Sequence, residues 1–183
     1  AFAKVNTINA GGVSGLTATA SNVSSSTFST ITNAVATSTY NLTVNGVAIY
    51  AGADNLAIGA SLTASDVAAQ VNLFSAQTGV SAAISGTTLT LTASDGRNVV
   101  VAETITQGAG ATLAGTGIAA AQEGTLRGTI TLSAAQNITL GGANADIGFA
   151  STSIAVDTTT LSTVSVTSVA NANTAIQRSD AAL

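Results

Sequence analysis

The residues that could perform chemistry in this chain are few, and the sequence keeps them apart. Five aspartates are solitary in the sequence: Asp54, Asp66, Asp95, Asp146 and Asp157. Hydrolysis of a glycoside needs two carboxyl groups on either side of one bond. Folding would have to bring two of these residues together, so a hydrolase stays an alternative that the sequence does not itself favour.

Other kinds of catalytic and metal site are excluded by the residue types present. The 183 residues include no His, Cys, Met, Trp or Pro. A Ser-His-Asp triad, a cysteine nucleophile and a zinc site of the usual ligands therefore cannot be built from this chain. We expect no catalytic residue, no cofactor and no metal site.

Glycine-rich segments give only weak signals of ligand binding. Residues 141–146 resemble one calcium-binding nonapeptide repeat, but Asn144 stands where glycine is expected and the pattern occurs once. A plain turn is the prediction there. Residues 108–110 and 115–117 lack the third glycine of a dinucleotide-binding fingerprint, and Lys4 lies in no phosphate-binding loop. We interpret residues 107–117 as a flexible connection.

One hydroxyl cluster is a candidate for modification. Ser24, Ser25, Ser26 and Thr27 are consecutive in a stretch dominated by Ser and Thr, residues 21–39. We expect this stretch to be mostly exposed, as a solvated loop or an irregular β excursion. In that setting the four hydroxyls are either possible acceptors of O-linked sugar or part of an ordinary loop.

Charge and hydropathy restrict the partners. The chain has four basic and eight acidic residues, so its net charge is −4. Lys4, Arg97, Arg127 and Arg178 are too scattered to form a basic patch, so nucleic acid and anionic membrane are not expected partners. No stretch approaches the roughly 20 apolar residues of a membrane-spanning helix.

The spacing of apolar residues predicts the elements that must carry these groups. A helix is expected over residues 1–9 and a strand over 15–20. Residues 40–50 predict a β-hairpin, because Asn45-Gly46 suits a tight turn with positive φ. A second helix is expected over residues 65–77, capped by Thr63 or Ser65 and stopped at Gly79.

After the second helix the pattern returns to strands. Residues 80–85 and 87–92 predict a pair around Gly86, and Asp95-Gly96 predicts a turn into residues 98–102. Residues 5–10 resemble residues 71–76, and residues 15–18 resemble residues 79–82, which suggests two copies of one helix-then-strands unit. Short strands follow over residues 125–133, 137–140 and 153–156. A helical tail is expected over residues 171–183. The fold class is therefore α+β, with small antiparallel sheets, two short helices packed on them and a C-terminal helical tail.

Several of these segments resemble bacterial flagellin. Residues 41–47, the helix bearing Val71-Asn72, residues 78–82 and residues 89–99 are together similar to the repeat found inside flagellins and related filament-cap proteins. Residues 127–133 and 138–142 resemble the later part of the same variable outer region. Residues 161–176 and 180–183 resemble the return into the long carboxy-terminal helix.

The resemblance implies a structural role. Residues 1–162 would form the variable outer region, as one body or as two lobes at about 1–106 and 107–162, and residues 163–183 would be the return segment. The expected function is a surface-exposed part of the flagellar filament, contributing to motility and antigenicity. Its partners would be other flagellin subunits. It would be exported by the type III apparatus, and its place would be extracellular.

Two other assignments remain open at this stage. A β-rich, Thr-rich domain also suits a glycan- or surface-binding module of an adhesin, and the repeat also occurs in flagellar cap proteins. The chain is expected to be a fragment without the helical ends that polymerise the filament. We therefore expect it to be a monomer in isolation.

Overall fold

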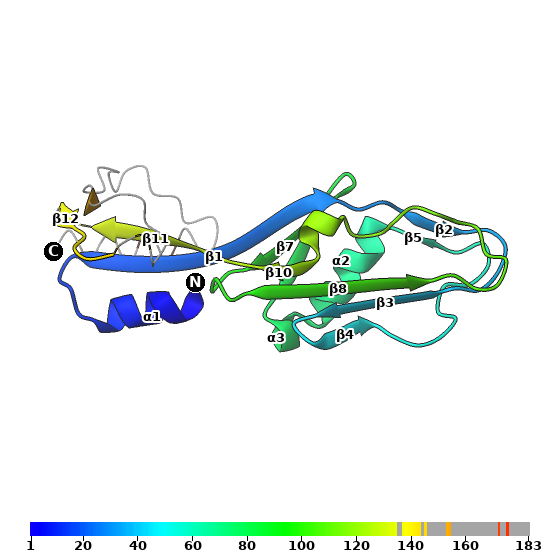
Figure 1. Cartoon of the computed structure of the whole chain (residues 1–183), viewed down its shortest axis with the longest axis horizontal. Coiled ribbons are helices and arrows are strands. Elements are labelled where there is room, and N and C mark those ends of the chain that lie inside the picture. The colour runs from blue at the N-terminus through cyan, green and yellow to red at the C-terminus, as the bar shows by residue number, and fades with distance from the viewer. Residues whose placement is uncertain (135–136, 144, 146–152, 155–171, 173–174, 176–183) are drawn as a thin grey trace. The chain divides into compact units, whose positions relative to one another are not determined.

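The computed structural model describes residues 1–134, 137–143, 145, 153–154, 172 and 175. The fold is α+β and rich in strands, with small antiparallel sheets and three short α-helices in the described residues (Figure 1). This confirms the expected fold class. The predicted helical tail over residues 171–183 lies outside the described residues, apart from residues 172 and 175.

The helices and strands follow in chain order. The helices are α1 Phe2–Ala10, α2 Ala64–Leu73, α3 Ser75–Thr78 and the 3-10 turn η1 Ala120–Gln122. The strands of the first half are β1 Leu16–Thr27, β2 Ile31–Asn33, β3 Thr39–Val44, β4 Val47–Tyr50 and β5 Ser61–Leu62. The later strands are β6 Ser81–Ser85, β7 Thr88–Ala93, β8 Val99–Thr106, β9 Leu113–Ala114, β10 Gly124–Leu126, β11 Thr129–Ala134, β12 Ile138–Thr139 and β13 Ser153–Ile154.

The chain divides into two compact units that are not contiguous in sequence. The first unit comprises residues 1–2 and 21–129, and the second comprises residues 3–20 and 130–183. Strand β1 contributes its first residues to the second unit and the rest to the first unit. The predicted boundary at residue 163 lies outside the described residues and stays a prediction.

The predicted hairpin is confirmed. Strands β3 and β4 pair antiparallel, with Val44 opposite Val47. Between them, Asn45 has φ 51° and Gly46 has φ 79°, which is the left-handed backbone that a two-residue hairpin turn requires. The turn therefore forms for the reason that the sequence indicated.

The second helix begins where predicted and is interrupted before its expected end. The Thr63 hydroxyl accepts from the Asp66 N–H, and the Asp66 carboxylate accepts from the Thr63 N–H at 2.9 Å, so a capping box starts α2. The backbone breaks the helix at Phe74, and α3 continues to Gly79, which ends it in the left-handed conformation at φ 71°.

Two antiparallel sheets and α2 enclose the core of the first unit. One sheet has the order β10-β8-β3-β4. In the other, β6 pairs with β7, and β7 pairs with β1. Helix α2 packs against β6, β7 and β4 (Figure 1). Inward positions alternate along the strands, as at Leu42 and Val44 in β3 and at Leu89 and Leu91 in β7, all of which are buried. This period of two is what a sheet with one buried face requires.

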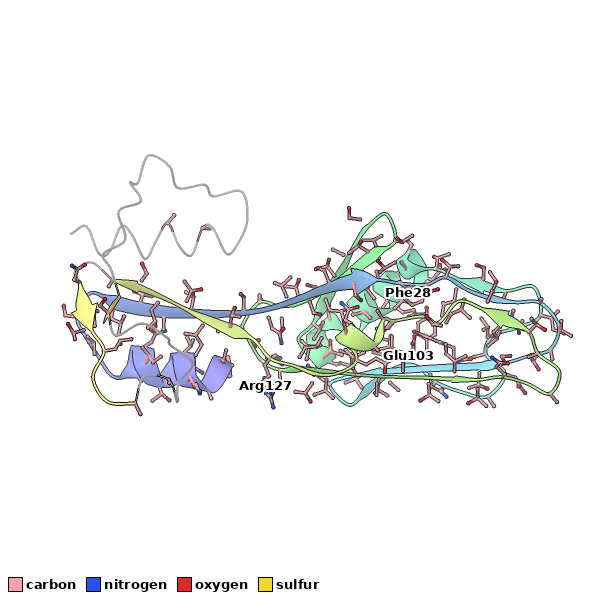
Figure 2. All side chains as sticks on the ribbon, turned by 45° about the horizontal axis from the view of Figure 1, so that its top comes forward. Phe28, Glu103 and Arg127 are labelled. Atoms are coloured by element: carbon pink, nitrogen blue, oxygen red, sulfur yellow. The ribbon has the colours of Figure 1, made fainter. Side chains whose placement is uncertain are left out.

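We expected residues 21–39 to be mostly exposed, and this is wrong for the residues whose side chains face the core. Strand β1 runs on to Thr27 and pairs with β7, and β2 pairs with β5 and β9. Phe28 and Ile31 are buried in the core, as the side chain labelled in Figure 2 illustrates for Phe28. The inward face of β1 also carries the buried Asn22, whose amide donates to the carbonyl oxygens of Arg97 and Leu126.

The flexible connection expected over residues 107–117 is also wrong. Strand β9 lies inside it and pairs with β2. A Cβ at Gly115 would collide with the Thr30 carbonyl oxygen, and one at Gly108 would collide with that of Thr37. These glycines therefore permit close backbone approach, whereas Gly110 has open space around it.

The second unit begins with the predicted first helix and strand. Helix α1 buries Val5, and β1 buries Ala18. Strands β12 and β13 pair with Ile138 opposite Ile154, which confirms parts of two short runs predicted from sequence. Among the helices in the described part of the chain, none is long and apolar enough to cross a membrane.

Candidate functional site

The hydroxyl cluster, expected in a solvated loop or an irregular β excursion, forms the last four residues of strand β1. Ser24 to Thr27 pair in register with β7, so their side chains alternate between the two faces of the sheet. Ser25 and Thr27 are exposed, and Ser25 Oγ lies 2.8 Å from Thr90 Oγ1. Ser26 instead donates to Gln122 Oε1 at 2.8 Å. Two of the four hydroxyls are therefore accessible, and the solvated-loop interpretation is wrong.

Gln122 ties this strand to its neighbour from inside the molecule. Its side chain is fully buried, and Nε2 donates to the carbonyl oxygens of Ser24 at 2.8 Å and Leu89 at 3.2 Å. Because Ser26 supplies a donor to its Oε1, the amide is satisfied at both ends. We interpret Gln122 as a structural residue that holds β1 and β7 in register.

The aspartates within the described residues do not converge. Asp66 caps α2, and Asp95 forms an exposed ion pair with Arg97, with a carboxylate-to-guanidinium distance of 2.7 Å. The Thr63 hydroxyl lowers the pKa of Asp66, and hydrogen bonding from Arg97 lowers that of Asp95. Asp54 has positive φ in a turn. Asp146 and Asp157, like Asn144 of the possible calcium repeat, lie outside the described residues.

One carboxylate that the sequence analysis did not single out is partly enclosed. Glu103 lies on β8, on the same side as Val99 and Val101, and Figure 2 labels it on this strand. Its two oxygens accept from the Ile118 N–H at 3.1 Å each. The strand alternation could have revealed it, because Glu103 follows Val101 at the inward spacing of two.

Burial governs the ionisation of this group. It raises the pKa of Glu103, and hydrogen bonding from the Ile118 N–H offsets part of that rise. Burial likewise raises the pKa of Tyr40, and the adjacent Glu103 raises it further. The Tyr40 hydroxyl is buried and near Glu103, although its geometry falls short of a good hydrogen bond.

The Glu103 carboxylate holds a turn against the sheet rather than facing an open site. A Cβ at Gly117 would meet this carboxylate, so the backbone of that turn lies directly on it. The described residues contain no group of three or more His, Cys, Asp or Glu side chains placed to bind a metal. The geometry therefore gives Glu103 the role of a structural anchor.

Three asparagines form a repeated arrangement on the backbone. Asn72 Oδ1 accepts from the Ala82 N–H, and its Nδ2 donates to the Ala82 carbonyl oxygen, both at 2.8 Å. Asn9 makes the same two bonds to Ala18, at 2.8 and 2.9 Å, and Asn55 makes them to Tyr40, both at 2.7 Å. We call each of these an asparagine clamp. The Asn45 side chain instead binds two different residues: it accepts from the Val100 N–H and donates to the Thr78 carbonyl oxygen, both at 2.8 Å.

The clamps refine the internal similarity found in the sequence. That comparison placed Asn6 opposite Asn72, whereas the hydrogen bonds make Asn9 the equivalent of Asn72. Ala18 remains the equivalent of Ala82, as the sequence indicated. The helix-then-strand unit therefore occurs twice, once in each compact unit, with a difference of one residue in the loop.

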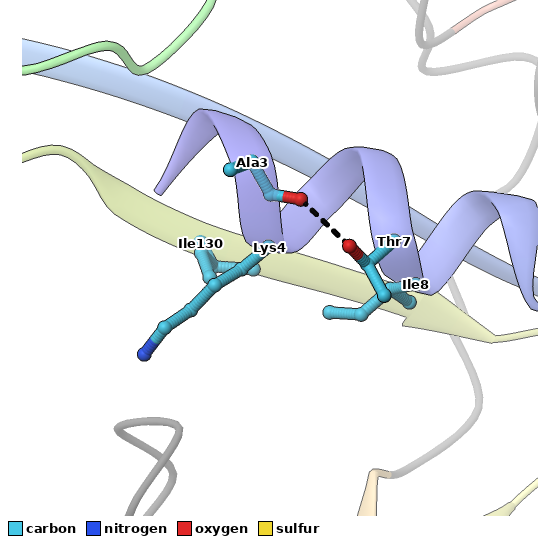
Figure 3. A pocket seen from close by; sticks show the side chains of 5 residues that line it. All are labelled: Ala3, Lys4, Thr7, Ile8 and Ile130. Atoms are coloured by element: carbon cyan, nitrogen blue, oxygen red, sulfur yellow. Dashed lines mark hydrogen bonds between the residues drawn. The ribbon is translucent and has the colours of Figure 1, made fainter.

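A shallow hollow of about 270 Å³ lies beside α1 in the second unit (Figure 3). Its lining is mostly apolar and comes from α1 and from Ile130: Ala3, Lys4, Thr7, Ile8 and Ile130. The Thr7 hydroxyl donates back to the Ala3 carbonyl oxygen at 3.0 Å, so it is already used within the helix. The hollow has no arrangement of polar groups that would orient a substrate.

No protein-family model and no curated protein sequence matches this chain.

Proposed function

We propose that this chain forms the surface-exposed outer part of a bacterial flagellar filament subunit, with other subunits of the same kind as its partners. It is a structural protein in this proposal, and its place is outside the cell. Its roles are to add bulk and antigenic surface to the filament.

The proposal is supported by the hydrogen bonds and backbone conformation of residues in the segments that resemble flagellin. Asn45 and Asn72, which belong to the segments similar to flagellin, hydrogen-bond to backbone groups of neighbouring elements. Thr78, from the same segments, donates to the Phe74 carbonyl oxygen at the start of its own helix. Gly79 adopts the positive φ that its helix end requires. Side chains used in this way hold the backbone in place, which suits a structural role.

The surface chemistry is compatible with the same role. The outward positions of β1, β7 and β6 at one level of the sheet are Thr27, Thr88 and Ser85. Such faces are polar but uncharged, and they can be varied without disturbing the core behind them. Exposed Ser25 and Thr27 are accessible acceptors if the subunit carries O-linked sugar.

The test is to locate the protein on cells of the organism that carries the gene. Antibodies raised against the purified chain, detected by immunogold electron microscopy, should decorate filaments along their whole length. Label confined to filament tips would favour a cap protein. Label on the cell body with bare filaments would favour an adhesin. Either pattern would overturn the proposal, and a strain lacking the gene is the control.

A further inference from the structure

Strand β6 ends its sheet among the described strands, and Asn72 occupies its free edge. Ala82 lies opposite Leu91 of β7, yet its N–H is bonded to Asn72. In an antiparallel pair, residues alternate between those bonded to the partner strand and those whose backbone groups face away from it. The N–H and C=O of Ala82 therefore face away from β7, and Asn72 binds both of them.

An asparagine amide in this position imitates a neighbouring strand. It presents one acceptor and one donor side by side, as a strand residue does in a bonded pair. The Asn9 clamp does the same to Ala18 in β1, where the pairing with β7 has not yet begun, since it starts at Asn22. The same device appears a third time in the described residues, because Asn55 accepts from the N–H of Tyr40 in β3 and donates to its carbonyl oxygen.

The β6 edge lacks the usual protection against strand addition. Natural edge strands are guarded by charged residues, proline or bulges. The sequence of β6 is Ser-Ala-Ala-Ile-Ser, with no charge and no proline, and its pairing with β7 is regular. Ile84 follows Ala82 at a spacing of two in the same ladder, so its backbone groups face the same edge, and the residue is 37% exposed.

We propose that the Asn72 clamp is an autoinhibitory contact that prevents β6 from pairing with β6 of a second copy of this chain. A second copy is the expected occupant because two uncharged β6 edges can meet antiparallel without repulsion between like charges. Loss of the clamp frees the N–H and C=O of Ala82 next to those of Ile84. The free edge then accepts a strand.

The first experiment compares Asn72→Ala with the unchanged chain by light scattering after size exclusion, over a hundredfold range of concentration. The unchanged chain should stay a monomer, and N72A should approach twice the monomer mass. The matched control is Thr63→Ala, which removes the cap of the same helix without touching Ala82. This variant should remain monomeric.

A second variant separates edge pairing from aggregation of a weakened fold. Ala83→Lys in the N72A background places a lysine on β6, and two lysines would meet across an antiparallel pair of edges. It should restore the monomer. The proposal is overturned if N72A stays monomeric, if T63A associates to the same extent, or if A83K leaves the association of N72A unchanged.

Discussion

Burial sets the behaviour of Glu103 at the scale of the single residue. Its pKa is raised in the folded chain, so the folded state binds this proton more tightly than the unfolded state does. The resulting stabilisation is complete below the unfolded-state pKa and is lost as the pH rises through the folded-state pKa. At neutral pH the ionised group therefore remains at a disadvantage in its half-buried position.

Glu103→Gln tests this directly, because the amide keeps an acceptor for the Ile118 N–H but does not titrate. The free energy of unfolding of the unchanged chain, minus that of E103Q, should increase as the pH is lowered from 7 to 4. Denaturant titrations at each pH measure it. Asp66→Asn is the opposite control, because the pKa of Asp66 is lowered and its stabilisation is lost on acidification. A flat difference for E103Q would contradict the burial argument.

Single residues also show what the sequence could and could not reveal. The Thr63 cap, the Asn45-Gly46 turn and Gly79 are recognisable because their signals are local. The inward position of Glu103 could have been predicted from the alternation of residues along its strand alone. Gln122 was not, because its partners Ser24 and Leu89 are 98 and 33 residues away and nothing local marks its burial.

At the scale of the element, two phenylalanines show how position within the fold determines stability. Phe28 follows β1 and is 2% exposed, whereas Phe74 lies at the break between α2 and α3 and is only partly buried against the same core. The helical spacing with Val67 and Val71 predicts a full core position for Phe74. The break at this residue leaves its ring partly in solvent.

Phe28→Ala should cost about 3–5 kcal/mol of unfolding free energy, as for other buried aromatic residues, and Phe74→Ala should cost clearly less. Each variant is the control for the other, because the same side chain is removed from the same unit. Two-state urea titrations give both values. Equal losses would mean that Phe74 is as well packed as Phe28.

Long-range pairing explains why one strand segment was predicted as mostly exposed. The second half of β1 is recognisable only beside β7, where Ser25 meets Thr90 across 65 residues of chain. The hairpin of β3 and β4 needs no distant partner, and it was predicted correctly. Close backbone approach is similarly invisible in sequence, which is why Gly115 was assigned to a flexible connection.

At the scale of the whole molecule, the described apolar core is distributed unequally between the two units. Every residue of the main buried cluster, from Phe28 to Ile118, belongs to the first unit. In the described part of the second unit, the buried apolar residues are Val5, Ala18 and Ala134. Because burial of apolar surface supplies most of the stability of a fold, the two units should not resist opening equally.

Amide hydrogen exchange on the full chain tests this difference. The amides of α1 should exchange through local opening, many times faster than those of β3 and β8, whose protection should approach that of global unfolding. Addition of a low concentration of denaturant should accelerate β3 and β8 steeply and α1 only slightly, since local opening exposes little surface. The Asn9→Ala variant supplies an internal check, because loss of its clamp on Ala18 should accelerate exchange in α1 and leave β3 and β8 unchanged. Equal protection and equal denaturant sensitivity of α1 and β8 would show instead that the two units open as one cooperative body.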